Sequence, residues 1–206
     1  THRLNHNAVK MYDKQGSVLR VETTINDPHD IKVFRGKEGD EGGAKDWRIL
    51  RKGVADLHRR AQVSQAANER YLAGLAAANE TTALAKLSEP LCRPTQYRGK
   101  RVRALNPLSG DDAALLESVS RAEFLVHGFR NHDLQPLLYG APPRTKEEQR
   151  RRSAAVTRKL RLLRAHGLIR KVPKSHRYLL SDQGQRVITA VLAARQADTA
   201  KLTAAA

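Results

Sequence analysis

Cysteine is almost absent from this chain of 206 residues, in which Cys92 is the single example. A disulfide within the chain needs two cysteines, so disulfide-stabilised secreted scaffolds are excluded and a reducing cytoplasm fits better. Cys92 lies in a predicted loop away from any histidine cluster. A lone thiol in such a place is typical of an ordinary cysteine, and we do not expect a nucleophile or metal ligand there.

Aromatic residues, at 4% of the chain, and long hydrophobic runs are also scarce. No stretch approaches the about 20 apolar residues of a membrane span, and we expect neither a signal peptide nor a membrane partner. The sequence contains no Walker-type phosphate loop, no zinc-spaced Cys/His cluster and no serine nucleophile elbow. We therefore predict no cofactor and no metal site, and the sequence favours no enzymatic activity for this chain alone.

Acidic residues are few relative to basic ones: 21 Asp and Glu face 38 Lys and Arg, which gives a net charge of +17. The excess is strongest over residues 144–177, with 13 basic residues and two acidic ones. Such a field attracts polyanions and makes binding salt-dependent. With so few aromatic residues, the pattern favours nucleic acid over an anionic membrane. We expect a nucleoid-associated protein of the cytoplasm.

A basic helix is predicted within residues 150–177. Val156, Leu160 and Leu163 recur at i, i+4 and i+7, which places them on one helical face. Hydroxyl and guanidinium side chains occupy the other positions, namely Ser153, Thr157, Arg158 and Arg161. Because these groups hydrogen-bond phosphates and base edges, the helix is chemically suited to a nucleic-acid groove.

A hairpin and a last helix are predicted to follow. Gly167 stands where a helix commonly ends in the left-handed conformation. Residues 170–180 indicate two short strands around a polar tip at 173–176. Turn chemistry at 181–184 then precedes an amphipathic helix over 186–196.

Two further helices are predicted before the basic one. Ser109 is the expected N-cap of the first, with Asp112 completing a capping-box-like pair, and its apolar face fades at Gly128. Asn131 offers the N-cap of a short second helix, which ends at residues 139–140. The Ala-Pro-Pro run that follows cannot be helical. The third, basic helix is therefore expected to begin near residue 146.

This arrangement resembles the winged helix-turn-helix of the ArsR and MarR type of bacterial regulators. The resemblance covers residues 108–196, and its matching positions are Val156, Thr157, Arg158, Leu160, Leu163, Gly167, Leu168 and Ile169. It implies that Ser153, Thr157, Arg158 and Arg161 face the major groove. It also implies that Lys174, His176 and Arg177 lie on a wing. Residues 140–151 form a spacer longer than in a minimal helix-turn-helix.

The full predicted DNA-binding set combines this helix with its basic flank and the wing. Its members are Arg150, Arg151, Arg152, Ser153, Thr157, Arg158, Arg161, Arg170, Lys171, Lys174, Ser175, His176 and Arg177. The alternative interpretation is a winged helix that serves protein contacts or packing. The charge of the segment favours DNA.

The N-terminal part has a different pattern. Strands are predicted over residues 8–13 and 17–25, joined by a turn at 14–16, with a third over 31–34. A long helix follows over 54–78, with an apolar stripe that includes Val54, Leu57, Ala61, Ala67, Tyr71 and Leu75. The fold class is therefore α+β and mostly helical. We divide it into an N-terminal hairpin-and-helix region (1–87), a basic proline-containing linker (88–107), the winged helix-turn-helix (108–196) and a frayed tail (197–206).

The first hairpin carries a second resemblance, to rolling-circle replication initiator proteins of phages and plasmids. The matching positions are Lys10, Tyr12, Asp13, Lys14, Leu19, Arg20 and Glu22. The family combines a His-hydrophobic-His metal site with a helical tyrosine nucleophile, which makes Tyr71 a candidate. No such histidine triplet occurs in this sequence. Tyr71 also fits a core aromatic, and Tyr12, Arg20 and Glu22 fit a solvated cross-strand pairing.

Two functional classes stay open on the sequence. The first is a duplex DNA-binding protein whose N-terminal half supplies dimerisation, as a homodimer, or a second contact. The second is the C-terminal portion of a replication-initiator or transposase-like enzyme whose metal motif lies outside this chain, as a start at Thr1 suggests. An RNA-binding module is a third interpretation, without a visible stacking aromatic pair. We favour the first class.

Overall fold

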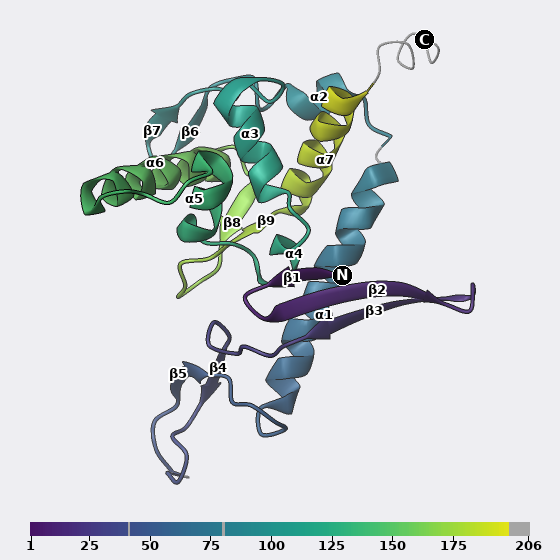
Figure 1. Cartoon of the computed structure of the whole chain (residues 1–206), viewed down its shortest axis with the longest axis vertical. Coiled ribbons are helices and arrows are strands. Elements are labelled where there is room, and N and C mark those ends of the chain that lie inside the picture. The colour runs from purple at the N-terminus through teal and green to yellow at the C-terminus, as the bar shows by residue number, and fades with distance from the viewer. Residues whose placement is uncertain (41, 80, 198–206) are drawn as a thin grey trace. The chain divides into compact units, whose positions relative to one another are not determined.

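A computed structural model describes residues 1–40, 42–79 and 81–197. The chain divides into two compact units, Thr1–Leu72 and Ala73–Ala206, and each is described by itself. Both combine helices with small antiparallel sheets, so the predicted α+β class is confirmed (Figure 1). The predicted frayed tail lies outside the described residues, apart from Ala197.

The first sheet of unit 1 is a three-stranded meander. Strands β1 (His2–Leu4), β2 (Asn7–Lys14) and β3 (Val18–Thr24) pair antiparallel in that order. The strands pair up to Lys14 and Val18, so residues 15–17 form a three-residue loop in which Gln15 and Gly16 both have positive φ. The predicted hairpin is confirmed, whereas β1 has no period-2 signal long enough to predict it.

A separate two-stranded sheet follows, made of β4 (Lys32–Arg35) and β5 (Asp46–Ile49). The predicted third strand is thus present, but its partner β5 was not predicted. Asp56 is buried beside this sheet and accepts hydrogen bonds from the Arg51 backbone N–H at 2.9 Å and its Nη2 at 3.1 Å. Because the Arg51 guanidinium favours the carboxylate, the pKa of Asp56 is lowered.

The long helix α1 (Leu57–Ala76) leads into a 3-10 turn, η1 (Ala77–Asn79). The predicted apolar stripe is largely wrong, since Val54 lies before the helix and is 79% exposed, and Leu57 is 57% exposed. Within α1 only Ala67 and Tyr71 are buried. The helical periodicity identified the element correctly, but Leu57, Leu72 and Leu75 are exposed.

Unit 2 begins within the last turn of α1, includes η1 and holds the remaining elements. They are α2 (Leu84–Ser88), β6 (Thr95–Tyr97), β7 (Lys100–Val102), α3 (Gly110–Val119), α4 (Phe124–His127), α5 (Asn131–Tyr139), α6 (Lys146–Ala165), β8 (Ile169–Lys171), β9 (Tyr178–Leu180) and α7 (Asp182–Gln196). Helices α3, α5, α6 and α7 surround one core (Figure 1). Its largest fully buried side chains include Leu115, Leu116, Leu134, Leu160, Leu163, Leu168 and Ile188.

The segment predicted as a linker, 88–107, is folded into unit 2. It forms the hairpin β6–β7, and the unit boundary found in the structure falls at residue 72 instead of 87. Leu91 and Leu105 are almost fully buried and joined by a backbone hydrogen bond of 2.8 Å. The prolines that suggested a linker flank these two anchors.

The first predicted helix is shorter than expected, because α3 ends at Val119 and α4 is a separate turn. Ser109 does occupy the N-cap position, but its side chain makes no capping bond. Asp112 is not its capping partner; this carboxylate instead binds the Arg103 guanidinium, at 2.6 and 2.7 Å, and the Asn106 backbone N–H at 2.9 Å.

The starts of α5 and α7 are each shifted from the prediction. Arg130 is the N-cap of α5, and its backbone N–H donates to Asp133 at 2.7 Å, so Asn131 is the first helical residue. Helix α7 begins at Asp182, within the segment predicted as a turn. Ser181 caps it by accepting from the Gly184 N–H at 2.9 Å.

Candidate nucleic-acid interface

The start of α6 is fixed by local hydrogen bonds. Thr145 is its N-cap, and the Thr145 hydroxyl accepts from the Glu148 backbone N–H at 3.1 Å. Glu148 in turn accepts from the Arg144 N–H at 2.8 Å. The pKa of Glu148 is lowered, mainly by the hydrogen bond from the Arg144 N–H and secondly by the one from the Arg152 guanidinium. The predicted start near Lys146 is confirmed.

The apolar stripe of α6 points into the core as predicted. Val156, Leu160 and Leu163 are all buried, at 0%, 2% and 0% exposure. Leu162, which lies outside the predicted stripe, is buried as well. Leu162 lines the space between α6 and β7. The β6–β7 hairpin therefore covers a flank of α6 that the apolar periodicity predicts to be exposed.

The end of α6 is a Schellman motif. Gly167 has a φ of +71°, the Leu168 N–H donates to the Leu163 carbonyl at 3.0 Å, and the Gly167 N–H donates to Arg164 at 3.1 Å. The predicted role of Gly167 is confirmed. With both ends capped and one face buried, α6 is a fixed support for its exposed side chains.

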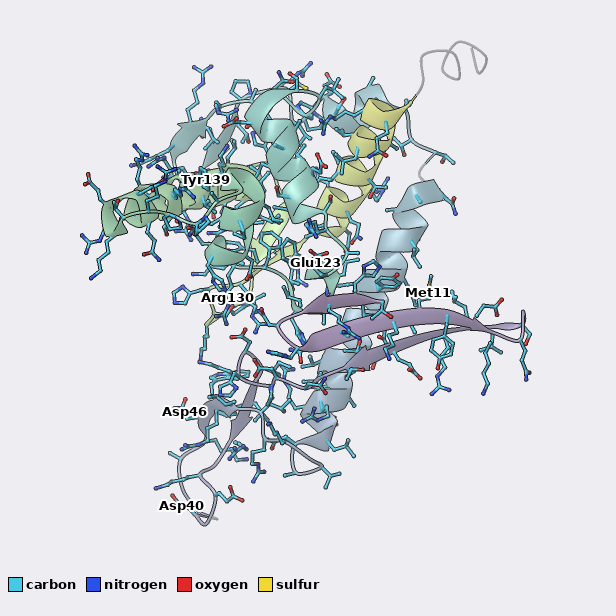
Figure 2. The ribbon with its side chains drawn as sticks, viewed as in Figure 1. Met11, Asp40, Asp46, Glu123, Arg130 and Tyr139 are labelled. Carbon is cyan, nitrogen blue, oxygen red and sulfur yellow. The ribbon has the colours of Figure 1, made fainter. Side chains whose placement is uncertain are left out.

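The exposed face of α6 carries cations and a hydroxyl group. Its members from the predicted set are Arg150, Arg151, Thr157, Arg158 and Arg161. In the described part of the chain, Arg150, Arg158 and Arg161 make no ion pair or side-chain hydrogen bond. Figure 2 shows the nitrogen-bearing side chains that project from this helix. Their charge is therefore available to an anionic partner.

The two flanks of α6 contact different elements. On one flank Asn131, at the start of α5, donates to the Ser153 carbonyl at 2.8 Å and to the Thr157 hydroxyl at 3.0 Å. On the other flank Lys159 pairs with Asp111 of α3 at 3.0 Å. Ser153 is half-buried as a result, and of the two hydroxyl residues only Thr157 is exposed.

Arg152 does not belong to the exposed face, contrary to the prediction. Its guanidinium binds Glu148 at 2.6 Å and the Ala141 carbonyl at 2.5 Å, and lies 4.9 Å from the ring centroid of Tyr139. Tyr139 is labelled at the end of α5 in Figure 2. Arg152 thus fastens the connection 140–145 between α5 and α6, and the second half of the predicted spacer, 146–151, is helical. The i,i+4 spacing of Glu148 and Arg152 indicates their pairing in the sequence, whereas the contacts with Ala141 and Tyr139 have no such signal.

The hairpin β8–β9 forms as predicted, and the exposed members of the predicted set on it are Arg170, Lys171, Lys174 and His176. Two other members have structural roles. The Ser175 hydroxyl donates to the Val172 carbonyl at 2.9 Å and accepts from the Arg177 N–H at 3.1 Å, which shapes the tip. Arg177 is only 8% exposed and its guanidinium donates to the His127 carbonyl at 3.2 Å. Its predicted place on the wing surface is wrong, because a buried partner holds it inside.

A third strand-like segment joins this hairpin. Phe129 forms an antiparallel bridge with Tyr178, with backbone hydrogen bonds of 2.9 and 2.8 Å in the two directions. The sequence gives no signal for it, because a single residue is too short for any periodicity.

The candidates of unit 1 lie in a different environment. Tyr71 is 8% exposed, and its ring centroid lies 5.5 Å from that of His2, an environment typical of a packed aromatic side chain. On β2 and β3, the Tyr12 hydroxyl donates to Glu22 at 2.9 Å, and Arg20 binds the same carboxylate at 2.7 Å. The hydrogen bond from the Tyr12 hydroxyl to Glu22 raises the pKa of Tyr12. Over the described ranges no three His, Cys, Asp or Glu side chains gather as a metal site would require.

Comparison with known proteins gives no match: no family model, no curated protein and no solved structure is similar to this chain. Within the residues that the structure describes, none of the helices has the length and apolar character needed to cross a bilayer.

Proposed function

We propose that this chain binds duplex DNA through a winged helix-turn-helix in unit 2. The element order supports this: α3 and α4 are followed by the Phe129 bridge, then by α5 and α6, the hairpin β8–β9 and finally α7. In this interpretation α5 and α6 are the helix-turn-helix, α6 is the recognition helix, and β8–β9 is the wing.

The observation that carries the proposal is the exposed face of α6. Arg158 and Arg161 stand one turn apart on a helix capped at both ends, with no acidic partner in the described structure. Guanidinium groups recognise guanine edges and phosphates through paired donors. The exposed Thr157 hydroxyl already donates to the Ser153 carbonyl at 2.9 Å, so the two arginines supply the free donors of this face. A cationic face on a fixed helix is the geometry that reading a major groove needs.

The distribution of charge supports a polyanionic partner for unit 2. Of the 38 Lys and Arg, 24 lie after residue 72, together with 11 of the 21 Asp and Glu, so that this unit holds +13 of the net +17. The exposed wing cations Arg170 and Lys171 extend the positive surface beyond α6. Neutralising phosphates with these groups releases counterions and makes binding salt-dependent.

The test is binding of labelled duplex DNA to the double variant Arg158→Ala/Arg161→Ala. We expect it to lose about 1–3 kcal/mol per base-reading contact on a target selected by the wild-type chain. Fluorescence anisotropy at physiological salt measures the loss. The control is Lys86→Ala/Arg93→Ala, which removes the same formal charge from exposed positions on and after α2, where Arg93 pairs with Glu89 at 2.5 Å.

The outcomes separate the role of α6 from bulk charge. Affinity of the α6 variant equal to that of the wild type would overturn the proposal. If both variants lost the same affinity, on selected and scrambled duplexes alike, α6 would contribute only non-specific charge to binding. Running the reactions with Mg²⁺ on a denaturing gel adds a check, since a nick or covalent adduct would point to the DNA-processing alternative.

A further inference from the structure

A second cationic surface lies beside α6, on the flank away from α5. The structure has an open groove of about 560 Å³ between β7 and α6. Six cationic side chains line it: Lys100, Arg101, Arg103, Arg158, Lys159 and Arg161. Three of them come from the segment after Tyr97, which the predicted site does not include.

The six cations are not equivalent. Arg103 is held by the buried carboxylate of Asp112 at 2.6 Å, and Lys159 is held by Asp111 at 3.0 Å. Lys100, Arg101, Arg158 and Arg161 have no acidic partner within the described ranges. The groove therefore contains uncompensated positive charge from two elements, β7 and α6.

The hairpin that presents Lys100 and Arg101 is fixed on α6. Its two turn residues, Arg98 and Gly99, have φ of +52° and +72°, as the tight turn between two strands requires. The Tyr97 ring lies 5.6 Å from the Arg98 guanidinium and 5.4 Å from that of Arg164 on α6. The contact with Arg164 joins the hairpin to the helix, so Lys100 and Arg101 keep their place beside α6.

From this geometry we infer that the β7–α6 groove binds the sugar-phosphate backbone of one DNA strand. The inference rests on the proposed function, because a helix in the major groove lies between two phosphate backbones about 12 Å apart. The flank of α6 near Asn131 faces one of them. The flank near Lys100 and Arg101 then faces the other. The β6–β7 hairpin is thus a second basic wing, whose contacts fix register without reading sequence.

The experiment measures the salt dependence of duplex binding for the variant Lys100→Ala/Arg101→Ala of the full chain. Each lost phosphate contact lowers the slope of log K against log[KCl] by about one unit, so we expect a slope less steep by about two. The ratio of affinities for a selected and a scrambled duplex is expected to stay unchanged. The charge-preserving variant Lys100→Arg/Arg101→Lys is expected to keep the wild-type slope.

Control variants make the outcome specific to the groove. Lys86→Ala/Arg93→Ala is expected to leave the slope as in the wild type, and thermal melting verifies that each variant folds. If the hairpin variant has the slope of this control while Arg158→Ala/Arg161→Ala loses affinity, the groove inference fails and the proposed function stands. If the wild-type chain does not bind duplex DNA, the proposed function fails and the groove inference fails with it.

Discussion

At the scale of single residues, intramolecular pairing decides which cations of unit 2 can contact an anion. Arg158 and Arg161 stay available, whereas Arg152 is engaged by Glu148 and Arg177 by the His127 carbonyl. The sequence predicted all four as DNA contacts, three on the basic helix and Arg177 on the wing, because residue type alone does not distinguish an exposed arginine from one with an internal partner. The His127 carbonyl that holds Arg177 comes from a distant segment, which only the folded chain reveals. Glu148, in contrast, lies four residues before Arg152 on the same helix, a spacing that favours this pair.

The Arg103–Asp112 pair is the best-defined ion pair beside the proposed site. Asp112 is 5% exposed and accepts two guanidinium hydrogen bonds and one from the Asn106 N–H. The guanidinium of Arg103, aided by that N–H, holds the pKa of Asp112 below its usual range. A carboxylate with a lowered folded-state pKa stabilises the fold above its unfolded-state pKa, and this stabilisation is lost as pH falls through the folded-state pKa.

We therefore expect Asp112→Asn to lower the free energy of unfolding by about 1–3 kcal/mol at pH 7. The difference from wild type should shrink in acid, where the wild-type carboxyl also becomes neutral. Urea denaturation at neutral and acidic pH measures both values. The neighbouring Asp111→Asn is the control. The Asp111 side chain is 91% exposed and pairs with Lys159, and an exposed pair of this kind contributes about 0–1 kcal/mol. A pH-independent difference for Asp112→Asn would contradict the assigned cause.

At the scale of elements, strong local signals were sufficient. The β2–β3 hairpin, α6 with its buried stripe and the ending of α6 at Gly167 were all predictable, because turn chemistry and periodicity act within a few residues. The β6–β7 hairpin was missed, since strands of three residues carry little period-2 signal and neighbouring prolines suggested a linker. Half of the candidate groove therefore lay outside the predicted site.

The Phe129–Tyr178 bridge lies next to Gly128, whose backbone conformation and close packing favour glycine. Gly128 has φ +76° and ψ −168°, a backbone region essentially restricted to glycine. A Cβ at this position would also overlap the Tyr178 carbonyl oxygen of β9. The bridge and the wing can therefore meet only because this position has no side chain.

We expect Gly128→Ala to destabilise the chain by about 2 kcal/mol or more, from backbone strain and the clash together. Gly140→Ala is the matched control, because Gly140 also has a positive φ of 71° but open space around its Cα. Gly140→Ala should lose only the stability that comes from the strained backbone conformation, which is the smaller part of the expected loss for Gly128→Ala. Chemical denaturation compares the two variants, and equal losses would mean that close packing on β9 contributes nothing.

At the scale of the whole molecule, the proposed functions lie in one unit. The exposed face of α6, the wing and the β7–α6 groove all belong to residues after 72, as does +13 of the net charge. The sequence showed that charge asymmetry, but the unit boundary falls inside the predicted helix, where composition changes little. A boundary of this kind is set by tertiary contacts, which the local pattern does not record.

This division leads to a prediction for the isolated fragment 73–206. It retains the buried core of α3, α5, α6 and α7, including Leu116, Leu134 and Ile188, so it should unfold in one cooperative transition. It also retains every cation assigned to the DNA contact, and we expect its duplex affinity and salt slope to match the full chain within about threefold and one unit. Calorimetry and anisotropy measure these properties. A folded fragment that binds far more weakly would assign a second DNA contact to the +4 charge of unit 1, since the intact α6 and groove could not account for the loss.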